Sequence, residues 1–290
     1  MCGAAPKAAL AALLALSATV AAADTGPVHG LWVWKGSSIL ADVHGTDALV
    51  QFCRTAQINE IYISVSDHGD LSALSHFVPL IDALHHAGVR VEALLSSTEA
   101  DEGGKHLDKL LDHVQRVVQF NHEHAGSRFD GIHLDIEPQQ RPENKGPGNL
   151  RFLPGLVQAY RAVRSVAEAA HLTVNADIQN KLLKGSLEQR RLLLSSLPRL
   201  TLMMYELSSP SDHDTPDQKV AKARDASAQF LAMAYQDLPD PSLARLELAL
   251  RTPDYGALLP DVLAALEAAD RTNPHYLGWA RHAYNDPPTP

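Results

Sequence analysis

Cysteine is almost absent from this chain, which has two among its 290 residues. Cys2 lies in an N-terminal segment that we expect to be removed, so the mature chain keeps only Cys53 and no intrachain disulfide can form. Cys53 stands in the apparent helix ALVQFCRTA, where a free cysteine is typically a small buried apolar side chain. A surplus of basic residues is also lacking. The formal net charge of -9 argues against a nucleic-acid partner.

Long apolar runs are confined to the N-terminus. Lys7 precedes the run AALAALLALSATVAAA, which ends in small residues before Asp24. This pattern predicts a signal peptide over residues 1–23 with cleavage near Ala23, although a buried N-terminal helix would be the alternative. The run is too short and too rich in alanine for a good membrane span. We therefore expect a secreted or periplasmic protein, with residues 24–290 forming the mature domain and no membrane span in it.

Strand-like and helix-like segments alternate along the rest of the chain. The predicted strands cover residues 29–34, 60–65, 90–95, 129–138, 173–178, 200–206, 246–252 and 276–281. Helical periodicity lies near residues 46–57, 72–87, 105–123, 149–170, 186–195, 215–234 and 257–269. This order predicts an α/β fold, a single (β/α)8 TIM barrel whose last helix is missing or short. A doubly wound open sheet is the alternative, but no G-x-G-x-x-G motif follows any strand, and we expect no cofactor.

The fourth strand carries the most informative pattern, FDGIHLDIEP. Ile132, Leu134 and Ile136 alternate with polar residues, so His133, Asp135 and Glu137 share the other face. Burying three unpaired titratable groups would be too costly for an ordinary core strand. Asp135 and Glu137 also stand at the strand's C-terminal end, which is the end where (β/α)8 enzymes place their chemistry.

The same alternation predicts a polar barrel interior on the other strands. The inward residues are expected to be Tyr62, Ser64 and Ser66; Glu92 and Ser96; Asn175 and Asp177; Met203 and Tyr205, with Glu206 at the rim; Glu247 and Arg251; and either Trp279 with Arg281 or Gly278 with His282. Glu92, Glu247 and a buried arginine could form an internal ion network instead of a functional site.

Asp135 and Glu137 lie two residues apart on one face, so they cannot both ionise cheaply. Glu137 can therefore stay protonated near neutral pH and act as a general acid, while Asp135 holds and tunes it. Trp279 or Trp34 could supply a flat apolar platform for a sugar ring. With Asp177, Tyr205 and Glu206 around the same mouth, these residues predict a glycoside hydrolase site.

The motif resembles the strand-four signature D-G-x-D-x-D-x-E of glycoside hydrolase family 18, the chitinase-like (β/α)8 barrels. Asp130, Gly131, Asp135 and Glu137 match, and His133 replaces the first inner aspartate. The segment MMYE ending at Glu206 resembles that family's M-x-Y-D, and Trp279 resembles its tryptophan at the floor of the sugar site. The family's strand-three pattern S-x-G-G is replaced by LLSSTE.

The resemblance implies a retaining mechanism without an enzyme nucleophile. Glu137 would protonate the glycosidic oxygen, Asp135 would orient the 2-acetamido group of the substrate, and Tyr205 would bind its oxygen. The implied substrates are polymers that contain N-acetylhexosamine: chitin, peptidoglycan or an exopolysaccharide. The expected binding residues are Trp279, Asp177, Glu206, Asn175, Trp34, Tyr62, Arg251 and His133.

Other functions stay open. A family 25 muramidase barrel also carries D-x-E on a strand. A barrel that binds sugar without cutting it would keep the aromatic residues. A metal-dependent hydrolase could use His29, His133 and His282 with Asp135, although no H-x-H falls on the first strand and we expect no metal. Asp212, His213 and Asp214 are expected to form a polar loop.

Overall fold

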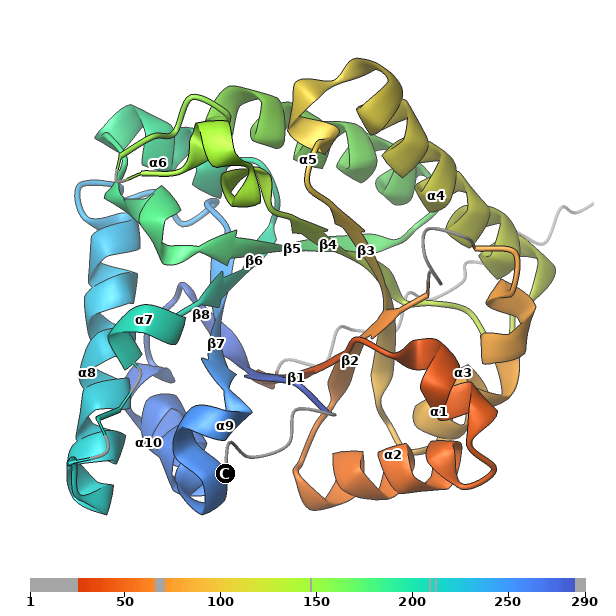
Figure 1. Cartoon of the computed structure of the whole chain (residues 1–290), viewed down its shortest axis with the longest axis horizontal. Coiled ribbons are helices and arrows are strands. Elements are labelled where there is room, and N and C mark those ends of the chain that lie inside the picture. Colours follow the sequence, from red (N-terminus) through yellow and green to blue (C-terminus); the bar gives the residue numbers. More distant parts are fainter. Residues whose placement is uncertain (1–25, 66–70, 147, 209, 212, 285–290) are drawn as a thin grey trace, which may run out of the picture.

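The computed structural model contains one closed barrel of eight parallel strands that follow one another in sequence order (Figure 1). It describes residues 26–65, 71–146, 148–208, 210–211 and 213–284, without the side chains of residues 206 and 207. The predicted signal peptide, Ser66 and Asp212 lie outside these residues. The strands are β1 (Val28–Val33), β2 (Glu60–Ser64), β3 (Arg90–Ser97), β4 (Gly131–Ile136), β5 (Thr173–Gln179), β6 (Arg199–Met203), β7 (Arg245–Arg251) and β8 (Tyr276–His282).

Helices surround most of the barrel (Figure 1). The long ones are α2 (Gly45–Thr55), α3 (Val78–His86), α4 (Gly104–Glu123), α5 (Leu153–Ala169), α6 (Leu187–Leu194), α8 (Pro216–Tyr235) and α10 (Leu259–Asp270). This confirms the predicted (β/α)8 barrel and its seven intervening helices. In the described part of the chain, which ends at residue 284, no helix follows β8.

Three short helices were not predicted: α1 (Gly36–Ala41), α7 (Tyr205–Ser208) and α9 (Thr252–Tyr255). They start within a few residues of the C-terminal ends of β1, β6 and β7. β6 is therefore shorter than predicted, and Tyr205 begins a helix rather than ending a strand. The consequence is extra structure at the end of the barrel where the acidic strand β4 also terminates.

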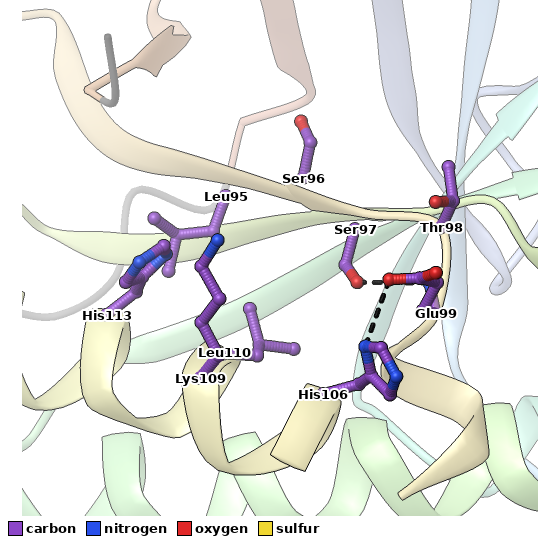
Figure 2. A pocket seen from close by; sticks show the side chains of 9 residues that line it. All are labelled: Leu95, Ser96, Ser97, Thr98, Glu99, His106, Lys109, Leu110 and His113. Atoms are coloured by element: carbon purple, nitrogen blue, oxygen red, sulfur yellow. Dashed lines mark hydrogen bonds and ion pairs between the residues drawn. The ribbon is translucent and has the colours of Figure 1, made fainter. Parts of the chain in front are cut away.

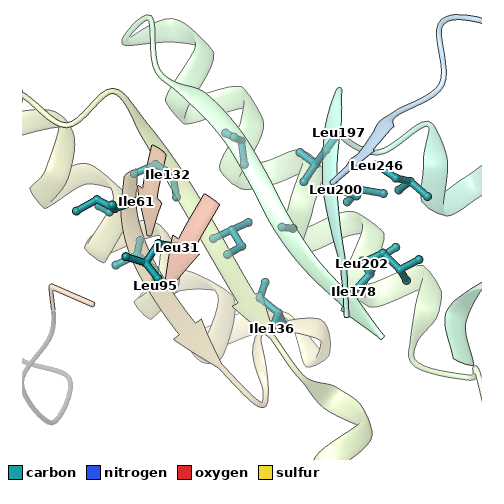
Figure 3. Packing of buried hydrophobic residues seen from close by; sticks show 14 of the residues in the cluster. Leu31, Ile61, Leu95, Ile132, Ile136, Ile178, Leu197, Leu200, Leu202 and Leu246 are labelled. Atoms are coloured by element: carbon teal, nitrogen blue, oxygen red, sulfur yellow. The ribbon is translucent and has the colours of Figure 1, made fainter. Parts of the chain in front are cut away.

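The main hydrophobic core lies between the barrel and its helices, where most of the aliphatic strand residues point, and a smaller cluster with Trp32 and Tyr62 lies inside the barrel. Ile132 and Ile136 of β4 and Leu200 of β6 belong to this layer, and all are at most 2% exposed (Figure 3). Local signals fix the helices against it. Ser186 and Thr215 each form a capping box, with Gln189 and Gln218 respectively, as helix-start chemistry predicts.

The barrel interior is polar in its lower layer, toward the N-terminal ends of the strands. The Arg199 guanidinium lies against Glu60 and 3.4 Å from Oε1 of Glu92. Glu247 accepts hydrogen bonds from the Tyr62 hydroxyl at 2.6 Å and from the Thr201 hydroxyl at 2.7 Å. The predicted internal ion network is thus confirmed in part: Arg199 pairs with Glu92 and with Glu60, which was not predicted, whereas Glu247 is hydrogen-bonded beside them.

Two glycines make room for these long side chains. A Cβ atom added at Gly30 would lie 2.3 Å from Oε1 of Glu247 and 2.5 Å from the Tyr62 hydroxyl. A Cβ atom added at Gly131 would lie 2.8 Å from Oε1 of Glu92. The chain therefore passes close to the carboxyl groups where β1 and β4 begin.

Cys53 is fully buried in α2, as predicted, and burial raises the pKa of its thiol to about 12. The thiol is accordingly protonated and unreactive at neutral pH. Among the described residues, no helix is both long and apolar enough to cross a membrane.

Candidate active site

β4 carries the three predicted groups up the inside of the barrel. His133 is 0% exposed, while Asp135 and Glu137 above it are only partly buried. Asp135 pairs with Ser96 in the register between β3 and β4, and the Glu137 backbone N–H donates to the Ser97 carbonyl at 2.9 Å. The strand ends there because Pro138 starts a single 3-10 turn. The Glu137 side chain is therefore held at the C-terminal rim of the barrel.

Three side-chain amides surround the Glu137 carboxyl group. Gln139 donates to Oε1 at 3.0 Å and Gln179 donates to the same oxygen at 3.2 Å. Gln140 donates to Oε2. Burial raises the pKa of Glu137, the Asp177 charge adds to the rise, and the three amide donors oppose it. The net shift is upward, toward the range in which a carboxylic acid can deliver a proton near neutral pH.

Asp135 has a still more strongly raised pKa. Its main cause is burial, followed by repulsion from Asp177 and Glu137, and the nearby His133 charge opposes the rise only in part. Asp135 therefore holds its proton more firmly than Glu137. Two neighbouring carboxyl groups that share protons in this way titrate as a pair.

Asp177 of β5 is fixed from two sides. The Trp32 indole N–H donates to Oδ2 at 3.1 Å, and Nε2 of His133 lies 2.9 Å from Oδ1. The buried Tyr160 hydroxyl of α5 donates to the Asp177 backbone carbonyl at 3.1 Å. Asp177 is thus held beside Asp135 by strands β1 and β4 and by a helix behind β5.

Aromatic residues form the opposite side of the mouth. The Trp34 indole N–H donates to Nε2 of His282 at 2.9 Å, and the Tyr205 ring meets the His282 ring edge-on at 5.6 Å between centroids. Burial and the charges of Asp177, Asp135 and Glu137 raise the pKa of Tyr205 well above its usual value, and Arg251 opposes this. Tyr205 therefore lies within electrostatic reach of all three acids and keeps its hydroxyl proton.

Comparison with solved structures places this barrel among chitinases by fold. A chitinase from Bacteroides thetaiotaomicron matches with a TM-score of 0.55 and 13% identity over 90% of this chain and 92% of that one. A class V chitinase from Pseudomonas fluorescens Pf-5 matches with a TM-score of 0.50 and 15% identity over 78% of this chain and 69% of that one. The chain has a divergent chitinase-like barrel fold.

The Ostrinia furnacalis Group IV chitinase, solved with allosamidin, matches the chitinase-like barrel with a TM-score of 0.50 and 10% identity over 78% of this chain and 66% of that one. The chain spans from 66% to 92% of the length of these three chitinases. No protein-family model matches the sequence, and no curated protein does so. At such low identities the likeness concerns the fold alone.

Trp279 does not line the mouth of the chitinase-like barrel. It points outward from β8 into the layer under the helices, where it stacks on His29 at 4.1 Å between centroids and is 4% exposed. The other predicted register, with Gly278 and His282 inward, is the one β8 adopts. The indole that borders the mouth is Trp34, at the end of β1.

Three predicted binding residues lie too deep to touch a substrate, and the 0% exposed His133 is one of them. Tyr62 and Asn175 are each 0% exposed, and their polar groups bond to Glu247 and Thr201 respectively. Each stands one layer below the acids, because its strand enters the mouth only two residues later. Arg251 does reach the rim, where it faces Asp254 at 3.6 Å. The Glu206 side chain lies outside the described residues.

The histidines proposed for a metal site do not converge. His29 lies on the outer face and bonds to Glu267 of α10 at 2.9 Å, whereas His133 and His282 are inside. Within the described ranges, no three His, Cys, Asp or Glu side chains gather so that they could hold a metal ion. The residues proposed as metal ligands therefore do not come together at one site.

A partly open cavity of about 280 Å³ lies between the C-terminal end of β3 and α4 (Figure 2). Lys109 and His113 of α4 rise toward Leu95, and Nδ1 of His106 lies 2.9 Å from Glu99. Glu137 does not line this cavity, which lies on the outer side of β3.

Several residues of the site escaped the sequence analysis. Trp32 alternates with Trp34 in HGLWVW, and the same inward phase could have placed both. Gln179 follows Asp177 by two residues, and Gln139 and Gln140 directly follow the acid. Strand phase could have identified Gln179, but nothing in the sequence says that the amides of the short turn fold back onto Glu137.

Proposed function

We propose that this protein is a secreted glycoside hydrolase that acts on a polysaccharide containing N-acetylhexosamine, with Glu137 as its general acid and base. The observation that carries the proposal is the position of the Glu137 carboxyl group. It stands at the C-terminal rim of the barrel, half-buried and held by amides, with Asp135, Asp177 and Tyr205 within electrostatic reach. A carboxylic acid with a raised pKa in such a place is suited to protonate a leaving oxygen.

The chemistry proposed for Glu137 takes two steps. In the first, the carbonyl oxygen of the substrate's own 2-acetamido group bonds to the anomeric carbon while the glycosidic C–O bond breaks and the departing oxygen takes the Glu137 proton. In the second, water attacks the anomeric carbon, the ring formed by the acetamido group opens, and the Glu137 carboxylate takes a proton from the water. Over the two steps Glu137 gives up one proton and regains one, and no nucleophile from the protein is needed.

Asp135 and Tyr205 are suited to the acetamido group in this scheme. A carboxyl oxygen of Asp135 is suited to accept a hydrogen bond from the amide N–H, and the Tyr205 hydroxyl to donate one to the amide oxygen as it attacks. Trp34 offers an indole face at the mouth for a sugar ring. Chitin, peptidoglycan and exopolysaccharides that carry N-acetylhexosamine are the proposed substrates, consistent with the expected signal peptide.

Replacing Glu137 by glutamine tests the assignment. The mature protein and its Glu137→Gln variant would be assayed against chitin oligomers, peptidoglycan and bacterial exopolysaccharides by release of reducing ends. We expect a loss of at least about a hundredfold in kcat, because general acid catalysis contributes that much or more. Glu168→Gln, the same change on the outer face of α5 at a 55% exposed side chain, is the matched control and should keep full activity.

The outcomes separate hydrolysis from binding. Full activity of Glu137→Gln would remove Glu137 from the mechanism. Saturable binding of an oligosaccharide with no turnover on any substrate would favour a carbohydrate-binding barrel. Inhibition by a thiazoline mimic of the intermediate, or by allosamidin, is expected if the acetamido group participates; absence of binding at millimolar concentration would point to another glycosidase scheme.

A further inference from the structure

His133 lies between two carboxyl groups in the centre of the barrel. Its Nδ1 is 3.3 Å from Oε2 of Glu92 on β3, and its Nε2 is 2.9 Å from Oδ1 of Asp177 on β5. An ionised carboxylate only accepts hydrogen bonds, and a neutral imidazole has one N–H. Both contacts can be made at once by the imidazolium, which carries a proton on each nitrogen. The geometry itself therefore calls for a positively charged ring.

The remaining contacts of the ring agree with this charge. Tyr62 of β2 stacks on one face at 3.8 Å between centroids, and Trp32 of β1 meets the ring edge-on at 5.8 Å. Asp135, two residues further along β4, is the third carboxyl group nearby. Burial alone would lower the pKa of His133, but Asp177 and Glu92 outweigh it and raise the pKa to about 10.

Asp177 is bound on both of its oxygens, one by His133 and the other by the Trp32 indole. Hydrogen bonds between a cation and a carboxylate are among the strong ones. With both oxygens engaged, the Asp177 carboxyl group has a fixed orientation. Asp135 has neither partner, and its proton is retained by burial and by the two neighbouring acids.

We propose that His133 is a positioning residue: a buried imidazolium that holds Asp177 as a fixed carboxylate and leaves Asp135 and Glu137 as the pair that carries the exchangeable proton. The pattern this chain resembles has an aspartate at position 133. An aspartate there could share a proton with Asp135, whereas an imidazolium with both N–H groups engaged cannot accept one. The proposal deepens the proposed hydrolase function and rests on it for its kinetic consequence, while the charge of the ring does not depend on activity.

The charge is tested directly by NMR on the full chain with 15N-labelled histidine. His133 would be assigned by the disappearance of its signals in His133→Asn. We expect both ring nitrogens to be protonated at pH 8, with slowly exchanging N–H signals, whereas a solvent-exposed histidine is neutral there. His113→Asn, on α4 outside the barrel, is the control and should leave the His133 signals in place. A neutral His133 ring at pH 8 would overturn the proposal.

The kinetic arm compares the pH profiles of kcat/KM. His133→Asn leaves two buried carboxylates without their cation and risks misfolding, so His133→Asn/Glu92→Gln is made as well and removes the lower of those charges. Loss of the cation should move the alkaline limb upward by about one pH unit or more, because the His133 charge lowers the pKa of Asp135, which titrates together with Glu137. An unchanged profile with only a lower Tm would show a structural role and refute the proposal. A wild type that hydrolyses nothing would count against the hydrolase function alone, with the NMR result standing.

Discussion

Arg199 is the cation on which the lower layer of the barrel depends, and removing it should be costly. Its guanidinium, 15% exposed, lies between Glu60 and Glu92, whose side chains are 2% and 0% exposed. Breaking a buried ion pair by removing one partner costs about 3–5 kcal/mol, because the remaining charge stays buried. Arg90 still reaches Glu60 at 3.1 Å and His133 still reaches Glu92. We therefore expect Arg199→Met to lie at the low end, about 3 kcal/mol.

The assay is thermal unfolding followed by circular dichroism at pH 7. For a domain of this size, 1 kcal/mol corresponds to about 2–4 °C, so Tm should fall by about 6–12 °C. Arg164→Met, which breaks an exposed pair with Glu168 on α5, is the control and should change stability by no more than about 0.5 kcal/mol. Adding Glu60→Gln to Arg199→Met should restore part of the loss. A fall of under about 2 °C for Arg199→Met would refute the view that this layer is held by charge.

The pH dependence follows from Glu60. Burial would raise its pKa, but Arg199 and Arg90 outweigh burial and hold the pKa below its usual value. A carboxyl group with a lowered pKa in the folded state stabilises the fold above its unfolded pKa, and this contribution is lost as the pH falls through the folded value. The difference between wild type and Arg199→Met should therefore be full at pH 7 and shrink below about pH 4.

Two further predictions concern the acid and the displaced tryptophan. Gln179→Leu removes an amide donor that lowers the pKa of Glu137, so the alkaline limb of the pH–rate profile should move upward. Gln119→Leu, on the outer face of α4, is the control. A downward movement of the limb in Gln179→Leu would contradict the assignment of Glu137 as the acid. Trp279→Ala empties a buried position outside the barrel, so chemical denaturation should show that the free energy of unfolding falls by about 3–5 kcal/mol. The kcat/KM of the folded protein should be unchanged. A large fall in kcat/KM of fully folded protein would place Trp279 in the site after all.

The barrel could be predicted because segments with the hydrophobic period of a strand alternate with segments that have the period of a helix. The acidic face of β4 could be predicted because a strand places every second residue on one side. The inward-facing residues were predicted correctly where apolar residues occupy every second position of a strand, as Ile132, Leu134 and Ile136 do. The prediction failed on β8, where both sets of YLGWARH contain apolar and polar residues. There the resemblance favoured Trp279, and the alternation alone could not choose.

Depth was harder to predict than direction. Tyr62 and Asn175 point inward as expected, yet they lie one layer too low to meet a substrate. The depth of an inward-facing residue depends on how the strands are staggered around the barrel, and a single sequence does not reveal that stagger. Gln139 and Gln140 reach Glu137 because they lie in a three-residue 3-10 turn, which is too short for hydrophobic periodicity to reveal.

The close passage of β1 and β4 past the charged layer also limits how this barrel can change. Gly30 and Gly131 leave the volume that Glu247, Tyr62 and Glu92 fill, so neither position accepts even a methyl group while those side chains stay in place. Converting the layer to hydrocarbon would require substitutions on several strands at once, since shortening the acids alone opens voids beside the glycines. An engineer who redesigns this protein would do best to treat the glycines, the acids and Arg199 as one inherited block and to vary the rim above it.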